Sequence, residues 1–358
     1  SGPAGMTSYL WSGPGGYIAT LANPVRDPAL LSYGGTYSVV VTDGNGCSAT
    51  ASTDVIVNEP NAIVSGNIQY FNPAYTPLQN VTIKLQQNSI DKYTTSPTGS
   101  LGEYTFTNVA PGNYDVVATT TTTSNPVGGI NVTDAAQTNY WGVFFGNIEM
   151  VRFYAGDVVM NNMIDGTDAS RILQYFLTQG NPVWTVRPAW TFWNAGETIG
   201  GNTAAGGFPT IIVSGSNVTQ NLFGLVTGDF NQSFVPGSTK AVSESLTLIY
   251  GETISVIPDM EFDLPLSVAL DMEIGAVSLI MNFPSDLLEV NGVYLSDDPN
   301  ALLMYSVSGD ELRIGWNSLE PVILLEGESL LTLKVKLIGL PGEEGIRFKL
   351  AADPLNEL

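Results

Sequence analysis

The sequence predicts a mainly β protein, a multi-domain string of β-sandwiches with one small α-helical domain among them. Most of the chain consists of short runs in which apolar and polar residues alternate, the period of a strand with one buried face. Turns separate these runs, since the chain holds 38 Gly and 21 Pro among 358 residues. Near the middle the period changes, and Ile172, Leu173, Phe176 and Leu177 recur at the spacing of one helix face. A chain of this length holds about two to four domains.

The composition excludes several classes of function. The chain contains no histidine, so it has neither a Ser-His-Asp triad nor a histidine-bearing zinc site. Its 12 Lys and Arg residues against 34 Asp and Glu residues give a net charge of -22, which repels nucleic acid and anionic membranes. No apolar run reaches the roughly 18 residues that span a bilayer. We therefore expect no enzyme, no nucleic-acid partner and no membrane insertion.

The first segment, residues 1–58, alternates as strands at residues 9–11 and 36–43. It contains Tyr-x-Trp-Ser-Gly-Pro from residue 9 and Gly-x-Tyr-Ser-Val-x-Val-Thr-Asp-x-Asn-Gly-Cys from residue 35. These motifs resemble the immunoglobulin-like and polycystic-kidney-disease-like repeats of giant surface adhesins in the Bacteroidota. The resemblance implies a β-sandwich whose N-terminal strands are missing from this stretch, with Trp11 in its core.

The second segment, residues 59–122, follows a short linker and contains strand patterns at residues 63–70, 81–85, 104–106 and 114–117. It contains Pro-Leu-x-Asn-Val-x-Ile-x-Leu from residue 77 and Gly-x-Tyr-x-Phe-x-x-Val-x-Pro-Gly-x-Tyr from residue 102. These phrases resemble the prealbumin-like B-type repeat of bacterial collagen adhesins. The resemblance implies a second β-sandwich, of the kind that builds stalks.

Residues 157–168 place oxygen-bearing side chains at the positions that a calcium loop needs. Calcium takes about 6 to 8 oxygens, and a loop of about 12 residues supplies them from positions 1, 3, 5, 7, 9 and 12, with a backbone carbonyl at position 7. Val159 at position 3 offers no ligand, and Asn162 replaces the glycine of position 6, which is tolerable because Asn visits the left-handed region. The expected ligands are the side chains of Asp157, Asn161, Asp165 and Asp168 and the carbonyl of Met163.

The two halves of this loop recur separately, about 100 residues apart. The front half recurs at residues 228–233 and the back half at residues 130–134, so the chain order is back half, whole loop, front half. This order predicts that the two halves close into a second Ca²⁺ site, which would clasp the domain that contains it. Its expected ligands are Asp229, Asn231 and Ser233 at positions 1, 3 and 5, with Asn131 and Asp134 at positions 9 and 12.

A different interpretation of the same residues needs no metal. Thr133 and Thr167 stand where helix N-caps belong, and Asp134 and Asp168 suit the first turn of a helix. The loops would then be Asx turns and caps. Both interpretations predict a helix after residue 134 and another after residue 168.

The third segment, residues 123–240, contains both loops and both helices. A calcium loop that leads into a helix, repeated at a spacing of 34 residues from Asp134 to Asp168, resembles a dockerin. The permuted order of the halves and an insertion at residues 179–225 depart from that family. The insertion contains Trp184, Trp190 and Trp193, for which we expect a strand at residues 189–193 packed on the helices rather than a sugar-stacking platform.

The fourth segment, residues 241–358, is all strand, with patterns at residues 246–250, 265–270, 275–283, 311–316 and 329–337. It contains Gly-Ala-Val-Ser-Leu-x-Met-x-Phe-Pro from residue 275 and Ile-x-Trp-Asn-Ser from residue 314. These motifs resemble a cohesin. The resemblance implies a third β-sandwich, and a C-terminal strand of that fold is expected to be missing from this stretch.

Together the four segments predict a structural subunit or segment of an extracellular surface fibre or adhesin, secreted and stabilised by calcium. Dockerins and cohesins bind each other, so their adjacency in one chain permits an intramolecular clasp or head-to-tail self-association between copies. The alternative is a non-polymeric adhesin or cellulosome-like adaptor that binds a separate surface protein or a glycan.

Overall fold

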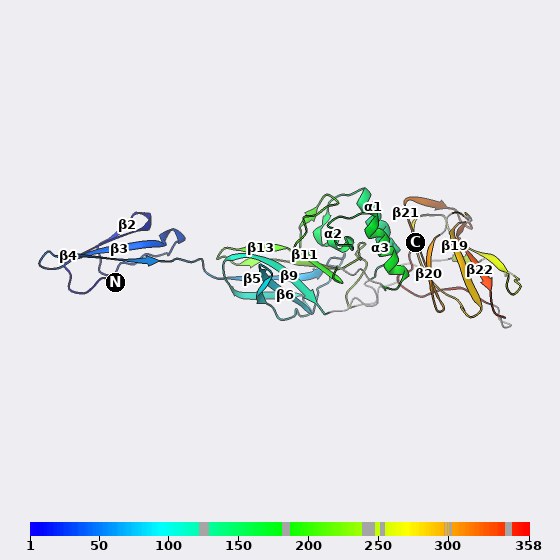
Figure 1. The fold of residues 1–358 in the computed structure, drawn as a ribbon, viewed down its shortest axis with the longest axis horizontal. Coiled ribbons are helices and arrows are strands. Elements are labelled where there is room, and N and C mark those ends of the chain that lie inside the picture. The colour runs from blue at the N-terminus through cyan, green and yellow to red at the C-terminus, as the bar shows by residue number, and fades with distance from the viewer. Residues whose placement is uncertain are drawn as a thin grey trace. The chain divides into compact units, whose positions relative to one another are not determined.

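The computed structural model describes residues 1–121, 129–180, 187–237, 248–250, 255–296, 298, 300, 303–340 and 346–358 (Figure 1). Strands account for 45% and helices for 12% of the residues, which confirms the mainly β class. Two compact units divide the chain: Ser1–Val64 with Phe106–Tyr114 and Ile212–Val218, and Ser65–Thr105 with Asp115–Ile211 and Thr219–Leu358. Among the described helices, none has the length and apolar character that crossing a membrane requires.

The N-terminal segment forms one antiparallel sheet in the order β2-β1-β3-β4. Trp11 lies opposite Val39 in the ladder between the two central strands. It is half-buried and donates its indole N–H to the carbonyl of Leu21 at 3.0 Å. The strands predicted at residues 9–11 and 36–43 are present. The elements are β1 (Ser8–Gly13), η1 (Pro14–Gly16), β2 (Tyr17–Ala19), η2 (Leu31–Tyr33), β3 (Gly35–Thr42) and β4 (Ser48–Val55).

Two further sheets contain the strands of the second segment. One has the order β11-β15-β5-β14, with β8 also paired to β5, and the other has the order β13-β9-β6-β7. All four strands predicted from the sequence of this segment are present. The segment's own strands are β5 (Ala62–Tyr70), β6 (Val81–Gln87), β7 (Ile90–Thr94), β8 (Glu103–Val109) and β9 (Gly112–Thr120).

Strands from the insertion enter these same sheets. β15 (Leu222–Val226) runs parallel to β5, with Gly224 opposite Tyr70, and β11 (Trp190–Asn194) runs antiparallel to β15. The sequence assigns β5 and the insertion to different domains, 59–122 and 123–240, whereas the pairing places strands of both in one sheet. The remaining insertion strands are β12 (Thr198–Ile199), which pairs with β10 (Ile148–Glu149), β13 (Thr210–Val213) and β14 (Val218–Thr219).

Two tryptophans of the insertion, Trp190 and Trp193, belong to the core. The centre of the Trp193 ring lies 4.6 Å from that of the Tyr154 ring, on helix α2 (Met150–Gly156). The strand expected at residues 189–193 is therefore present and packs on a helix as predicted. Trp184 lies outside the described residues.

Helices α1 (Val132–Val143) and α3 (Gly166–Leu177) are present where the sequence predicts them, whereas α2 (Met150–Gly156), which precedes the intact loop, was not predicted. The apolar stripe of α3 is buried, as its spacing predicts. The N-caps of α1 and α3 are Asn131 and Asp165, rather than the expected Thr133 and Thr167. The reason is geometric, since each cap side chain accepts a hydrogen bond from the backbone N–H two residues later.

The C-terminal segment is a sandwich of two sheets, β16-β17-β22-β19 and β20-β21-β18-β23. Leu279, Ile314, Leu333 and Val335 are fully buried between them. Every predicted strand is present over most of its described part, and the sequence analysis missed β19, β20 and β23. The strands are β16 (Leu248–Tyr250), β17 (Glu261–Val268), β18 (Met272–Asn282), β19 (Leu288–Leu295), β20 (Met304–Ser308), β21 (Glu311–Leu324), β22 (Ser329–Leu337) and β23 (Lys349–Leu350).

Candidate functional site

The first oxygen-rich loop, residues 157–168, joins the end of α2 to the start of α3. The carboxylate of Asp157 accepts two backbone hydrogen bonds, from Asn161 N at Oδ1 and from Asn162 N at Oδ2, each at 3.0 Å. The amide oxygen of Asn161 accepts a hydrogen bond from Met163 N at 3.0 Å. Asn162 has a φ of 62°, the left-handed conformation predicted for position 6. The front half of the loop therefore curls around one carboxylate.

Asp168 closes the back half of this intact loop. Its Oδ1 accepts a hydrogen bond from Val159 N and its Oδ2 accepts one from Asp165 N, both at 3.1 Å. Asp165 in turn accepts a hydrogen bond from Thr167 N at 2.7 Å, which completes a capping box at the start of α3. One carboxylate thus ties position 3 of the loop to position 9.

A second loop, which we call the split loop, is built from residues 130–134 and 229–234. Asp134 joins the two segments, because its Oδ1 accepts a hydrogen bond from Asn231 N at 2.8 Å and its Oδ2 accepts one from Asn131 N at 2.9 Å. Asp229 accepts Ser233 N at Oδ1 (3.0 Å) and Phe234 N at Oδ2 (3.3 Å). The structure therefore brings the two halves together, and metal binding there stays a prediction.

The two loops have matching hydrogen bonds at matching positions. Two isolated capping boxes would share only the bonds around positions 9 to 12, whereas the match extends to positions 1, 3, 5 and 6. The pattern therefore favours a common loop design over independent helix caps. The matched bonds, intact loop first, are Asn161 N to Asp157 and Ser233 N to Asp229; Asn162 N to Asp157 and Phe234 N to Asp229; Val159 N to Asp168 and Asn231 N to Asp134; Asp165 N to Asp168 and Asn131 N to Asp134; and Thr167 N to Asp165 and Thr133 N to Asn131.

The carboxylates that hold the loops are buried. Asp134, Asp157, Asp168 and Asp229 are each 0% exposed. Burial raises the pKa of Asp168 to about 6, although hydrogen bonds from two backbone N–H groups oppose the rise. Burial also raises the pKa of Asp157, against the lowering effect of Arg187. A cation within either loop would offset the cost of keeping these groups charged away from water.

Each position-1 carboxylate also accepts a hydrogen bond from outside its loop, on the same Oδ2 atom. Arg187 Nη2 donates to Asp157 at 2.6 Å, and Arg187 Nε donates to the carbonyl of Asp157. In the split loop the donor to Asp229 is the hydroxyl of Tyr70, at the end of β5. Burial, and then the charge of Asp229, raise the pKa of Tyr70 well above its ordinary value, so this hydroxyl remains a donor.

Sequence reasoning missed Tyr70 and Arg187. Tyr70 is 159 residues from Asp229 and Arg187 is 30 residues from Asp157. Neither residue belongs to a motif, and an alternating strand pattern gives no sign that its tyrosine reaches a distant carboxylate. The only available signal was the excess of acidic residues in the loops, which calls for nearby donors without naming them.

The oxygens present suit calcium. Ser233 Oγ, at position 5 of the split loop, is buried and has no hydrogen-bond partner among the described residues. An oxygen of this kind, in a loop with two buried carboxylates, fits a hard cation. Across the described ranges, no three Asp, Glu, His or Cys side chains form a metal-binding group by themselves. The predicted sets also include amide, hydroxyl and carbonyl oxygens, from Asn131, Asn161, Asn231, Ser233 and Met163.

Helices α1 and α3 pack against each other and against strands β18, β20 and β21 of the C-terminal sandwich. Gly315 on β21 permits this approach, because a Cβ atom there would lie 2.4 Å from Leu173 Cδ1 and 3.1 Å from Val132 Cγ2. Arg313 of β21 is 8% exposed and donates from Nη1 to the carbonyl of Phe176 at 3.1 Å. A cation at the C-terminal end of α3 also opposes the negative end of the helix dipole.

The C-terminal residues hold the other end of the helix pair. Glu357 accepts a hydrogen bond from Thr133 Oγ1 at 2.7 Å, and the carbonyl of Leu355 accepts one from Asn131 Nδ2 at 3.3 Å. The same residues run beside β18, where Ser278 N donates to the carbonyl of Glu357 at 2.9 Å. The split loop is thus bonded directly to the C-terminal sandwich.

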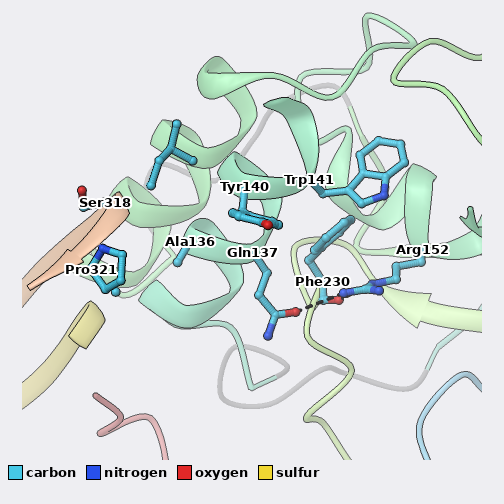
Figure 2. A pocket seen from close by; sticks show the side chains of 10 residues that line it. Ala136, Gln137, Tyr140, Trp141, Arg152, Phe230, Ser318 and Pro321 are labelled. Atoms are coloured by element: carbon cyan, nitrogen blue, oxygen red, sulfur yellow. Dashed lines mark hydrogen bonds between the residues drawn. The ribbon is translucent and has the colours of Figure 1, made fainter. Parts of the chain in front are cut away.

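Beside α1 lies a mainly apolar groove of about 450 Å³. Figure 2 shows the side chains of Tyr140 and Gln137 projecting from α1, with Pro321 on the neighbouring strand. At its other end the guanidinium of Arg152 lies 4.3 Å above the ring of Phe230. The lining residues are Ala136, Gln137, Tyr140, Trp141, Arg152, Phe230, Gly275, Ser318, Leu319 and Pro321.

Comparison with known proteins identifies one family model, the second β-sandwich domain of the BOS complex subunit NOMO1-like family, which matches residues 61–125. This match agrees with the β-sandwich predicted for residues 59–122. No curated protein matches the chain.

Several solved structures are similar in part. A non-cellulosomal cohesin from the hyperthermophilic archaeon Archaeoglobus fulgidus is 22% identical over 28% of this chain and 70% of that one, with a TM-score of 0.22. A form of BcpA, the major pilin subunit of Bacillus cereus, is 10% identical over 81% and 67% of the two chains, with a TM-score of 0.26. The full-length major pilin SpaD from Corynebacterium diphtheriae is 11% identical, and the match covers 79% of this chain and 58% of SpaD, with a TM-score of 0.23.

Replacing Asp134 and Asp229 tests whether the split loop is one unit. Asp134→Ala and Asp229→Ala should each lower the free energy of unfolding by about 2–4 kcal/mol, because each leaves buried N–H groups without an acceptor. The double variant should lose at least about 1 kcal/mol less than the sum, since either change alone already opens the loop. Chemical denaturation measures all three values. Losses in the free energy of unfolding that simply add would contradict a shared loop. The control is Asp134→Ala combined with Asp91→Ala, an exposed residue outside the loop, for which the losses should add.

Replacing Arg313 tests the contact between helix α3 and the sandwich. Arg313→Met should speed amide exchange in the last turn of α3, because Phe176 loses its guanidinium donor, and should lower stability by about 2–3 kcal/mol. Hydrogen exchange read by mass spectrometry measures the effect. The exposed Arg347→Met carries the same charge change and should leave α3 unaffected. Equal exchange in both variants would mean that this bond does not hold the helix.

Proposed function

We propose that this chain is a structural segment of an extracellular surface fibre or adhesin, in which calcium holds a dockerin-like helix pair as a fixed joint between β-sandwiches. The observation that carries the proposal is the split loop. One hydrogen bond joins the start of α1 to residues 229–234. The split loop also accepts a hydrogen bond from the hydroxyl of Tyr70 on strand β5, and it donates one to the carbonyl of Leu355 beside the C-terminal sandwich. A loop with those three connections transmits force between sandwiches instead of letting them swing.

Calcium would bind the two oxygen sets identified above. In the intact loop the ligands would be Asp157, Asn161, Asp165 and Asp168 with the carbonyl of Met163, and in the split loop they would be Asn131, Asp134, Asp229, Asn231 and Ser233. The ion would supply positive charge to buried carboxylates. The chain's own contribution is to hold these oxygens by backbone N–H groups, so that little rearrangement accompanies binding.

Self-association fits this role. The helix pair and the C-terminal sandwich complement each other within one chain, through Arg313, Gly315 and Glu357. Exchange of the same contact between copies would link them head to tail, because the helix face and the sandwich face are different surfaces. The role needs no catalysis and proceeds outside the cell, where millimolar calcium fills sites of modest affinity.

The groove beside α1 supports a second candidate, an adhesin or adaptor that binds a separate partner or a glycan. Tyr140 is 55% exposed at that groove, and exposed aromatic rings stack on sugars and peptides. This candidate requires the groove to take its ligand while the helix pair stays on the sandwich.

Removing calcium tests the proposed joint. We expect a chelator to lower the melting temperature and to speed amide exchange at residues 130–134, 157–168 and 229–234 far more than in β18 or β22, because unneutralised buried carboxylates repel each other. Melting curves and exchange with calcium and with chelator measure this. Superimposable curves and exchange would refute a calcium-dependent joint.

Fibre formation distinguishes the two candidate roles. Sedimentation and negative-stain electron microscopy of the chain in calcium should show linear assemblies that lengthen with concentration, and Arg313→Met should shorten them. Single particles at every concentration, together with saturable retention on an oligosaccharide array that Tyr140→Ala abolishes, would favour the adhesin or adaptor role instead.

A further inference from the structure

Arg187 lies outside the intact loop in sequence but contacts its first residue. Its side chain is 7% exposed and pairs with the fully buried Asp157 at 2.6 Å. The same guanidinium donates to the backbone carbonyl of Asp157 and lies 5.4 Å from the centre of the Tyr154 ring. Three contacts fix it, so the positive charge is a permanent part of the loop.

The split loop has a different group at the matching atom. There the hydroxyl of Tyr70, a neutral donor, bonds Asp229 Oδ2. Arg152 is close enough for its charge to interact with Asp134 and Asp229, and it donates hydrogen bonds to the carbonyl of Phe230 at 2.8 Å and to Gln137 Oε1 at 3.0 Å. Five backbone hydrogen bonds match between the two loops, but the group that donates to the matching Oδ2 atom is a guanidinium in the intact loop and a hydroxyl in the split loop.

A fixed guanidinium has two opposite effects on a loop that binds a divalent cation. It stabilises the metal-free loop, because it neutralises part of the charge of a buried carboxylate. It also repels an incoming Ca²⁺ and occupies one carboxylate oxygen of the residue at position 1. Because calcium affinity depends on the net charge of the ligands, both effects weaken calcium binding.

We propose that Arg187 is a built-in counter-ion that makes the two loops unequal. The intact loop keeps its conformation without metal and binds calcium weakly, whereas the split loop binds calcium more tightly and depends on it. The inference rests on the proposed function, because it assumes that both loops bind calcium. It makes the joint between sandwiches, formed by the split loop, the element that responds first to calcium.

Calcium titration by calorimetry of the metal-free chain tests this inference. Wild type should show a tight and a weak site, and Asp165→Asn, which removes one charge from the intact loop alone, should weaken only the weak site. Arg187→Gln should tighten the weak site by at least about tenfold and leave the tight site unchanged. The metal-free Arg187→Gln chain should also melt at a lower temperature and recover when calcium is added.

Two further variants separate charge from shape. Arg187→Lys keeps the charge and should keep the weak affinity, and the exposed Arg171→Gln, on α3, should change neither site. The counter-ion role is wrong if the chain binds two calcium ions but Arg187→Gln leaves the affinity of the weak site unchanged. It is also wrong if Arg187→Lys and Arg187→Gln tighten that site equally. In both cases the proposed function stands. If no variant binds calcium at either loop, the calcium part of the proposed function is wrong and this inference is wrong with it.

Discussion

The carboxylate of Asp134 is the constraint on which the middle of this protein depends. It accepts one hydrogen bond from its own helix cap, at Asn131 N, and one from Asn231, 97 residues along the chain. A fully buried acid cannot leave these bonds without leaving two N–H groups unsatisfied and its own charge unsolvated. The hydrogen bond from Asn231 thereby joins two points of the chain that are 97 residues apart.

This closure explains how a small helical unit can connect sandwiches. The segment between Asp134 and Asn231 contributes strands β11 and β15 to the sheet of β5, and helices α1 and α3 pack on β18, β20 and β21. Neither contact would hold a fixed geometry if the helices were free to separate from the strands. Tyr70 and Glu357 complete the arrangement, because each bonds the split loop or its helix from a different sandwich. This connectivity supports the function proposed above.

The sequence predicted more of this site than of its surroundings. The meeting of the two loop halves was foreseeable, because their oxygen-bearing residues keep the spacing of the intact loop even though the chain divides them. The buried stripe of α3 followed from its period. The N-caps were misplaced by two residues, since Thr and Asx residues compete for that role and only backbone geometry decides. The entry of β15 beside β5 could not be foreseen, because a parallel strand pair carries no local signal. Tyr70 and Arg187 were missed for the same reason, as their partners are distant in sequence.

The most direct measurement is a crystal structure of the chain soaked with terbium, which replaces calcium and scatters anomalously. The account predicts one anomalous peak within residues 157–168 and another between Asp134 and Asp229, with the Ser233 hydroxyl turned toward it. A map without a peak between Asp134 and Asp229, or with these two carboxylates in separate surroundings, would contradict the account.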